Sequence, residues 1–117
     1  MEISGQAVLL RVFIGESDKI GHLPLFEAIV KEARDAGLAG ATVLKGVLGY
    51  GATARIRTTK ILDLSADLSM VVEIVDEEAR ITAFQPTLSA LIEEANCGGL
   101  VTLENIRVIH YVPEKGA

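Results

Sequence analysis

Two short runs of branched apolar residues, each followed by a segment with helical periodicity, constrain the fold more than any other feature. The runs are Ala7–Ile14 (AVLLRVFI) and Ser69–Asp76 (SMVVEIVD). Runs this short, rich in Val, Ile and Leu, are typical of buried strands. The first run is apolar on both faces and ends at Gly15. We therefore predict two strands and expect the first to be central in its sheet.

The segment after the first run has the pattern of an amphipathic helix. Pro24 suits the first turn of such a helix, because the N–H that proline lacks has no partner there. Apolar residues then recur at helical spacing, and Gly37 is a natural C-terminal stop. The members of this apolar stripe are Phe26, Ile29, Val30 and Ala33.

A second helical stripe follows Asp76, which we expect to cap the helix, and it ends at the sequence NCGG. Pro86 lies within the stripe and predicts a kink or a restart of the helix, because proline clashes with the preceding turn. The apolar members are Ile81, Phe84, Leu88, Leu91, Ile92 and Ala95.

Two further strand patterns complete the order of elements. They are ATVLKGVLG (41–49) and LVTLENIRVIHYV (100–112). The order strand–helix–strand, occurring twice, predicts an α+β ferredoxin-like βαββαβ fold, with an antiparallel four-stranded sheet and both helices on one face. The other face would stay apolar, so we expect a homo-oligomer. We predict a single domain over 1–117, with a long loop at about 50–68 and a loose tail at 113–117.

Composition excludes several classes of function. The 117-residue chain carries a net charge of −5, which argues against nucleic acid as a partner. A single cysteine cannot form an internal disulfide and suits a reducing compartment. No apolar run approaches the length of a membrane span. We therefore expect a cytoplasmic protein.

One segment is positively charged although the chain as a whole is acidic. KGVLGYGATARIRTTK (45–60) combines glycines with four positive charges and no acidic residue. Closely spaced glycines allow a backbone to approach a ligand and to present N–H groups to an anion, and the basic side chains would neutralise its charge. A β-bulge with solvated arginines is the alternative. The candidate binding residues are Gly46, Gly49, Tyr50, Gly51, Arg55, Arg57 and Lys60, with Tyr50 able to lie on a base ring.

A second glycine pair, Gly98–Gly99, precedes the last strand pattern. It reads either as the cap of the preceding helix or as a second backbone loop that contacts the same ligand. The two interpretations are compatible, so both glycines are included among the candidate binding residues.

Other reactive residues give weaker signals. Glu16 and Asp18 follow the first strand, where we expect a solvated turn or a partner for the basic segment across a subunit interface. His22 and His110 are far apart in the sequence, and Cys97 has no base near it, so we expect an inert thiol. We predict no catalytic residue, no metal site and no cofactor; the protein is expected to bind rather than to catalyse.

The motifs LLRVFIGESDK, GLAGATVLKGVLGYGA and VVEIVD closely resemble the uncharacterised family numbered 190 among domains of unknown function, over about Leu9 to Tyr111. That family is similar in fold to PII signal-transduction proteins and to the CutA trimers. The resemblance implies a homotrimer with nucleotides in the clefts between subunits. LGYGA (48–52) looks like the PII segment that opens the mobile T-loop, and Cys97–Gly99 looks like the glycine turn before the last PII strand.

Departures from the PII pattern reduce the range of nucleotides that we expect the protein to bind. PII proteins carry a lysine after that glycine turn and an arginine pair near the C-terminus; GGLVTLEN and HYVPEKGA carry neither. The resemblance thus implies AMP or ADP in preference to ATP, in a PII-like sensor whose mobile basic loop meets a partner such as a membrane transporter, a channel or an enzyme. The alternative is a CutA-like structural or metal-associated trimer that binds no nucleotide.

Overall fold

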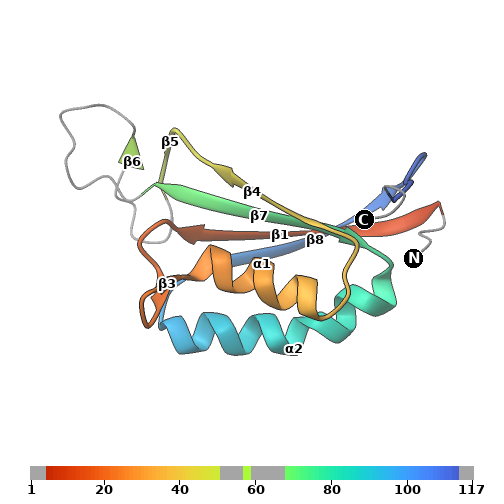
Figure 1. The fold of residues 1–117 in the computed structure, drawn as a ribbon. Helices are drawn as coiled ribbons and strands as arrows, with labels where there is room; N and C mark the ends of the chain where they lie inside the picture. Colours follow the sequence, from red (N-terminus) through yellow and green to blue (C-terminus); the bar gives the residue numbers. More distant parts are fainter. Residues whose placement is uncertain (1–4, 51–56, 59–67, 114–117) are drawn as a thin grey trace.

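The structure, a computed structural model, describes residues 5–50, 57–58 and 68–113. Within them the chain forms a four-stranded sheet with strand order β4-β7-β1-β8, and every neighbouring pair is antiparallel. Both helices lie on one face (Figure 1), which confirms the predicted ferredoxin-like class. The strands are β1 (Gln6–Gly15), β4 (Ala41–Lys45), β7 (Ser69–Asp76) and β8 (Leu100–Arg107), and the helices are α1 (Leu25–Asp35) and α2 (Glu78–Ala95).

The core lies between the sheet and the two helices. Alternate residues of β1 and β7 point into it, because successive side chains of a strand face opposite sides. Leu10 of β1 is fully buried and pairs in register with the buried Ile74 of β7. Ile29 of α1 and Phe84 of α2 close the core from the helix side. Each such side chain contributes roughly 1.5–3 kcal/mol on burial. The predicted central position of the first strand is confirmed.

Helix α1 begins one residue after Pro24, which was predicted to lie in its first turn, and it ends just before Gly37 as its sequence predicts. Pro24 is its N-cap, and its ring removes an N–H that would have had no helical partner. At the other end Gly37 has a φ of 78°, the left-handed region that favours glycine. The N–H of Gly37 bonds to the carbonyl of Arg34 and the N–H of Leu38 bonds to that of Ala33. This is the Schellman arrangement.

Helix α2 differs from expectation at its start and at Pro86. Its N-cap is Glu77, and the side chain of Asp76 does not cap the helix as predicted. Asp76 is the last residue of β7 and points into the protein, so its carboxylate accepts the N–H groups of Ala39 and Glu77 instead. The helix continues through Pro86 as one element, so the predicted restart is wrong.

Strand boundaries also differ from the sequence patterns. The second strand pattern, 41–49, divides into β4, which ends at Lys45, and β5 (Leu48–Gly49), which pairs with β6 (Arg57–Thr58). The last pattern, 100–112, ends as a strand at Arg107. The polar stretch after β1 contains a small unpredicted hairpin, β2 (Lys19–Ile20) with β3 (Leu23–Pro24).

The second face of the sheet has no helix over it in Figure 1. Phe13 lies there between Val71 of β7 and Leu100 of β8, its partners in register. Near the middle of the face, Arg11 forms ion pairs with Glu73 at 2.8 Å and Glu104 at 3.1 Å. The face is therefore apolar around a charged centre. No helix in the described part of the chain is long and apolar enough to cross a membrane.

Candidate functional site: the loop end of the sheet

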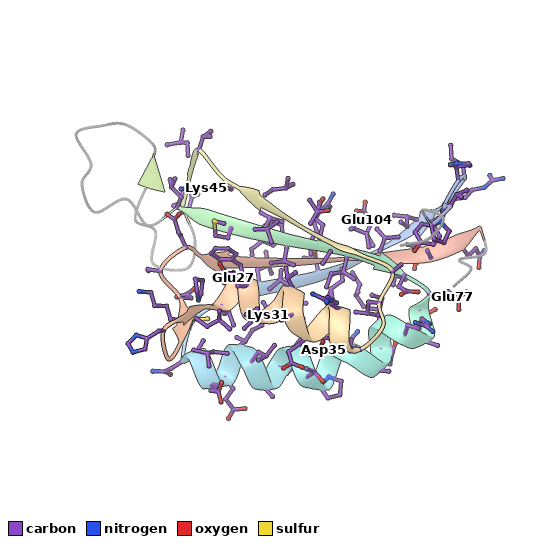
Figure 2. All side chains as sticks on the ribbon, viewed as in Figure 1. Glu27, Lys31, Asp35, Lys45, Glu77 and Glu104 are labelled. Atoms are coloured by element: carbon purple, nitrogen blue, oxygen red, sulfur yellow. The ribbon has the colours of Figure 1, made fainter. Side chains whose placement is uncertain are left out.

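One end of the sheet gathers most of the segments singled out in the sequence. Because the strands are antiparallel, β1 and β4 finish where β7 and β8 begin. Three segments therefore meet at this end: 46–50 after β4, 16–18 after β1, and 97–99 before β8. We call it the loop end. Figure 1 shows β5 and β6 there, and Lys45 is labelled there in Figure 2, opposite Glu77 at the far end.

Gly46 is needed for close packing within the chain. Its N–H donates to the carbonyl of Ser69 at 2.7 Å, and a Cβ at this position would lie 3.2 Å from that same oxygen. Glycine is thus explained here by the contact between the end of β4 and the start of β7. The amide of Gly46 is used inside the protein.

Gly49 and Tyr50 lie in and after the short β5 strand. Gly49 pairs with Arg57, so β5 and β6 form a short antiparallel ladder. A Cβ on Gly49 would lie 3.8 Å from the hydroxyl oxygen of Ser69, an ordinary contact distance. The side chain of Tyr50 is 68% exposed. Of the other predicted binding residues, Gly51, Arg55 and Lys60 lie outside the described residues, as does the side chain of Arg57.

The second glycine pair lies between α2 and β8. Asn96, which adopts the left-handed conformation with a φ of 51°, ends the helix, so the prediction that the glycine pair provides the helix cap is wrong. A Cβ on Gly99 would lie 3.4 Å from the carbonyl oxygen of Phe13. A Cβ on Gly98 would meet nothing within 4 Å. Gly99 therefore packs against the end of β1, whereas Gly98 borders open space.

The acidic residues after β1 are engaged within the chain. The Lys45 ammonium lies 2.8 Å from the Glu16 carboxylate, across the start of β7. Asp18 accepts the N–H of Gly15 at 2.7 Å through its side chain, and its carbonyl accepts the N–H of Leu25. Asp18 therefore shapes the turn, as one of the sequence interpretations held, and Glu16 has a basic partner in its own subunit.

Cys97 is held close to the same turn. Burial raises the pKa of the Cys97 thiol, and the neighbouring Asp18 carboxylate raises it further by its charge and by a hydrogen bond. Such a thiol carries little thiolate at neutral pH. His22 lies between β2 and β3 and His110 follows β8, and both are exposed. The described side chains contain no group of three or more His, Cys, Asp or Glu residues that could hold a metal ion.

The two glycine segments share the loop end but lie on opposite edges of the sheet. The first follows β4 and the second precedes β8, with β7 and β1 between these two edge strands. Three strand spacings place them about 14 Å apart. A single phosphate group cannot touch both segments of one chain, so the predicted common ligand requires either an elongated molecule or a second subunit.

The α+β fold is similar to that of several solved PII-like proteins. The apo form of CPII, a nitrogen regulatory PII-like protein from Thiomonas intermedia K12, matches with a TM-score of 0.59 at 16% identity, over 88% of this chain and 91% of that one. CPII bound to ADP, AMP and bicarbonate matches with a TM-score of 0.57 at 18% identity, over 88% of each chain. A putative PII-like signalling protein from Thermus thermophilus matches with a TM-score of 0.59 at 15% identity, over 93% of this chain and 94% of that one.

Sequence relatives give the family. The model of DUF190, described as "Uncharacterized ACR", matches residues 7–108. A "UPF0166 protein" of Aquifex aeolicus is 37% identical over 87% of this chain and 92% of its own length. A second UPF0166 protein, from Methanocaldococcus jannaschii, is 31% identical over 88% of this chain and 92% of its own length. The chain belongs to the DUF190 family, as its motifs suggested.

Sequence reasoning did not identify two residues that organise the loop end. Ser69 was assigned only to a strand, yet its carbonyl holds Gly46, and its hydroxyl lies near Gly49. Lys45 was counted among the positive charges but was not named as a binding residue. Lys45 stands beside Gly46 at the end of an apolar strand pattern. That position is the sequence feature that could have identified it as a binding residue.

Proposed function

We propose that the protein is a PII-like homotrimeric regulator that binds an adenine nucleotide in clefts between its subunits. The observation that carries the proposal is the placement of the two glycine segments at one end of the sheet but on opposite edges. Head-to-tail contacts, in which the β4 edge of one subunit faces the β8 edge of the next, form a ring when the rotation between neighbouring subunits closes. Each contact then unites the two segments in one cleft.

The glycines would have different roles in such a cleft. Gly46 and Gly99 pack against their own subunit, so they fix the position of the two segments. Gly98 and the exposed Tyr50 remain accessible, one on each side. Tyr50 offers an aromatic surface for the base, and Gly98 allows the backbone to approach the ligand.

An adenine nucleotide with one or two phosphates is the ligand we propose. CPII, which shares this fold, has been observed with ADP and AMP. The basic segment of this chain supplies Arg55, Arg57 and Lys60 for phosphate charge, but it lacks the further cations that the PII pattern uses for ATP. Charge-assisted bonds from such side chains contribute roughly 1.5–3 kcal/mol each.

Binding would act through the segment 50–68. A nucleotide held by its basic residues changes the conformations available to it, and hence the surface presented to a partner protein. We propose a membrane transporter, a channel or an enzyme as the class of partner, and a regulatory rather than a catalytic role for this chain.

Calorimetric titration with AMP, ADP and ATP, with and without magnesium, tests the proposal. We expect micromolar binding of AMP or ADP at about one ligand per subunit, with ATP weaker and no turnover of any of them. Light scattering on the same sample should report three chains per particle. The absence of heat and of a thermal shift with all three nucleotides would contradict the proposal and favour the CutA-like trimer.

A further inference from the structure

An ion pair at the loop end joins the end of β4 to the residue that follows β1. The Nζ atom of Lys45, the last residue of β4, lies 2.8 Å from the Oε2 atom of Glu16, which follows β1. Strand β7 lies between these two strands, so the pair crosses over its first residues. The side chain of Lys45 is 51% exposed and that of Glu16 is 35% exposed. Water and solutes therefore reach both groups.

The backbone on each side of the pair is fixed. Gly46, next to Lys45, donates to Ser69, and the N–H of Glu16 donates to the carbonyl of Leu68 at 2.8 Å. The Lys45 ammonium, in contrast, sits at the end of a flexible four-carbon stem. A half-exposed pair of this kind contributes little to stability. The ammonium can exchange its partner at small cost while the strands stay in place.

We propose, building on the nucleotide-binding function above, that Lys45 is a phosphate-binding residue and that Glu16 determines how many phosphates the cleft accepts. In the free protein the Glu16 carboxylate forms an ion pair with the Lys45 ammonium. It takes the position that a phosphate oxygen of the ligand would otherwise have. A bound nucleotide displaces it and takes over the ion pair. Glu16 therefore competes with the ligand and weakens its binding.

The displaced carboxylate also selects among nucleotides. Its backbone hydrogen bond to Leu68 keeps Glu16 at the loop end after the exchange. There its negative charge repels the phosphates, and the repulsion grows with the charge that the ligand carries. AMP is then affected least and ATP most. This adds a residue-level reason for the preference for fewer phosphates.

Titration of E16Q and K45Q variants with AMP, ADP and ATP tests the inference. E16Q should bind ADP about two- to fivefold more tightly, the gain expected from removing one exposed competing charge. Its gain should rise in the order AMP, ADP, ATP. K45Q should bind ADP at least about tenfold more weakly, because a charge-assisted bond is lost. A purely structural role of the pair would not produce a gain that depends on phosphate count.

Matched variants on α1 control for net charge. D35N and K31Q remove the same charges from exposed positions on α1, away from the loop end in Figure 2, and both should leave nucleotide affinity unchanged. Melting temperatures close to that of the wild type should show that all four variants are folded.

The outcomes separate this inference from the function on which it rests. If the wild type binds none of the three nucleotides, both are overturned. If the wild type binds while K45Q keeps full affinity, the inference alone is overturned. An E16Q gain equal for all three nucleotides would likewise overturn the role of Glu16 in selecting among them.

Discussion

The carboxylate of Asp76 accepts the N–H of Ala39 at 2.9 Å, although 37 positions separate the two residues. Its other oxygen accepts the N–H of Glu77 at 2.7 Å, and the side chain is fully buried. Asp76 thus joins the end of β7, the start of α2 and the connection between α1 and β4. Arg80 of α2 adds a hydrogen bond to the carbonyl of Gly37 at 2.8 Å in the same connection.

Replacing Asp76 should strongly destabilise the fold. In D76A two backbone N–H groups lose their acceptor inside the protein, and we expect a loss of roughly 2–4 kcal/mol in the free energy of unfolding. Urea denaturation measures this loss, with D35N on the exposed surface of α1 as the control. A change within about 0.5 kcal/mol of the wild type, the range of ordinary surface substitutions, would show that the two bonds are unimportant.

Arg11 should hold together the face that we expect a second subunit to cover. Its hydrogen bond to Glu73, and the charges of Glu73 and Glu104, raise the pKa of the guanidinium. Arginine keeps its positive charge in proteins, so the ion pairs do not depend on the protonation of Arg11. R11M leaves two carboxylates without their cation. We expect weaker self-association by analytical ultracentrifugation, and partial recovery in R11M/E73Q. A fully assembled R11M would contradict this role.

Gly46 and Gly98 should respond differently to the same substitution. A Cβ at Gly46 meets the carbonyl oxygen of Ser69 at 3.2 Å, and that oxygen cannot retreat without lengthening its bond to the Gly46 amide. We expect G46A to lose on the order of 1 kcal/mol of stability. G98A should keep full stability, because its Cβ points into open space, but should bind nucleotide more weakly. Thermal unfolding and calorimetry separate the two effects.

Cys97 should react slowly with alkylating reagents. Burial and the Asp18 carboxylate raise the pKa of its thiol, so at about pH 8 the reactive thiolate fraction is below that of an ordinary cysteine. The rate should rise with pH beyond the range where a free thiol has already levelled off. D18N removes the negative charge and should speed the reaction. Rates with iodoacetamide, compared with those in urea, measure the shift; equal rates in both would contradict it.

The fold could be predicted from the sequence because its signals are local and consistent. The runs 7–14 and 69–76 alternate in burial as strands, and Pro24 and Gly37 bracket α1 as their backbone chemistry requires. Predictions were wrong where a tertiary contact decides the outcome. The pattern 41–49 is continuous in sequence, yet β4 stops where Gly46 packs on Ser69. Asp76 resembles a helix cap, but it faces the connection before β4.

The candidate site could be predicted only in part. Glycine spacing drew attention to two segments, and the structure places both at the loop end. It could not show that they lie on opposite edges of the sheet, because strand order depends on pairing between distant residues. Nor could it show that Lys45 pairs with Glu16, which lies in the connection after β1. Both facts follow from the sheet, in which β7 lies between β1 and β4.

A subunit-mixing experiment tests most directly the claim that each cleft is shared between two subunits. K45Q damages the β4 side of the cleft, and G98D damages the β8 side; each variant alone should bind ADP poorly. Co-expressed in equal amounts they should regain about a quarter of the wild-type sites, because a ring that closes head to tail then contains clefts with two intact sides. Binding no better than that of the separate variants, in rings shown to contain both chains, would place the site within one subunit and contradict the account.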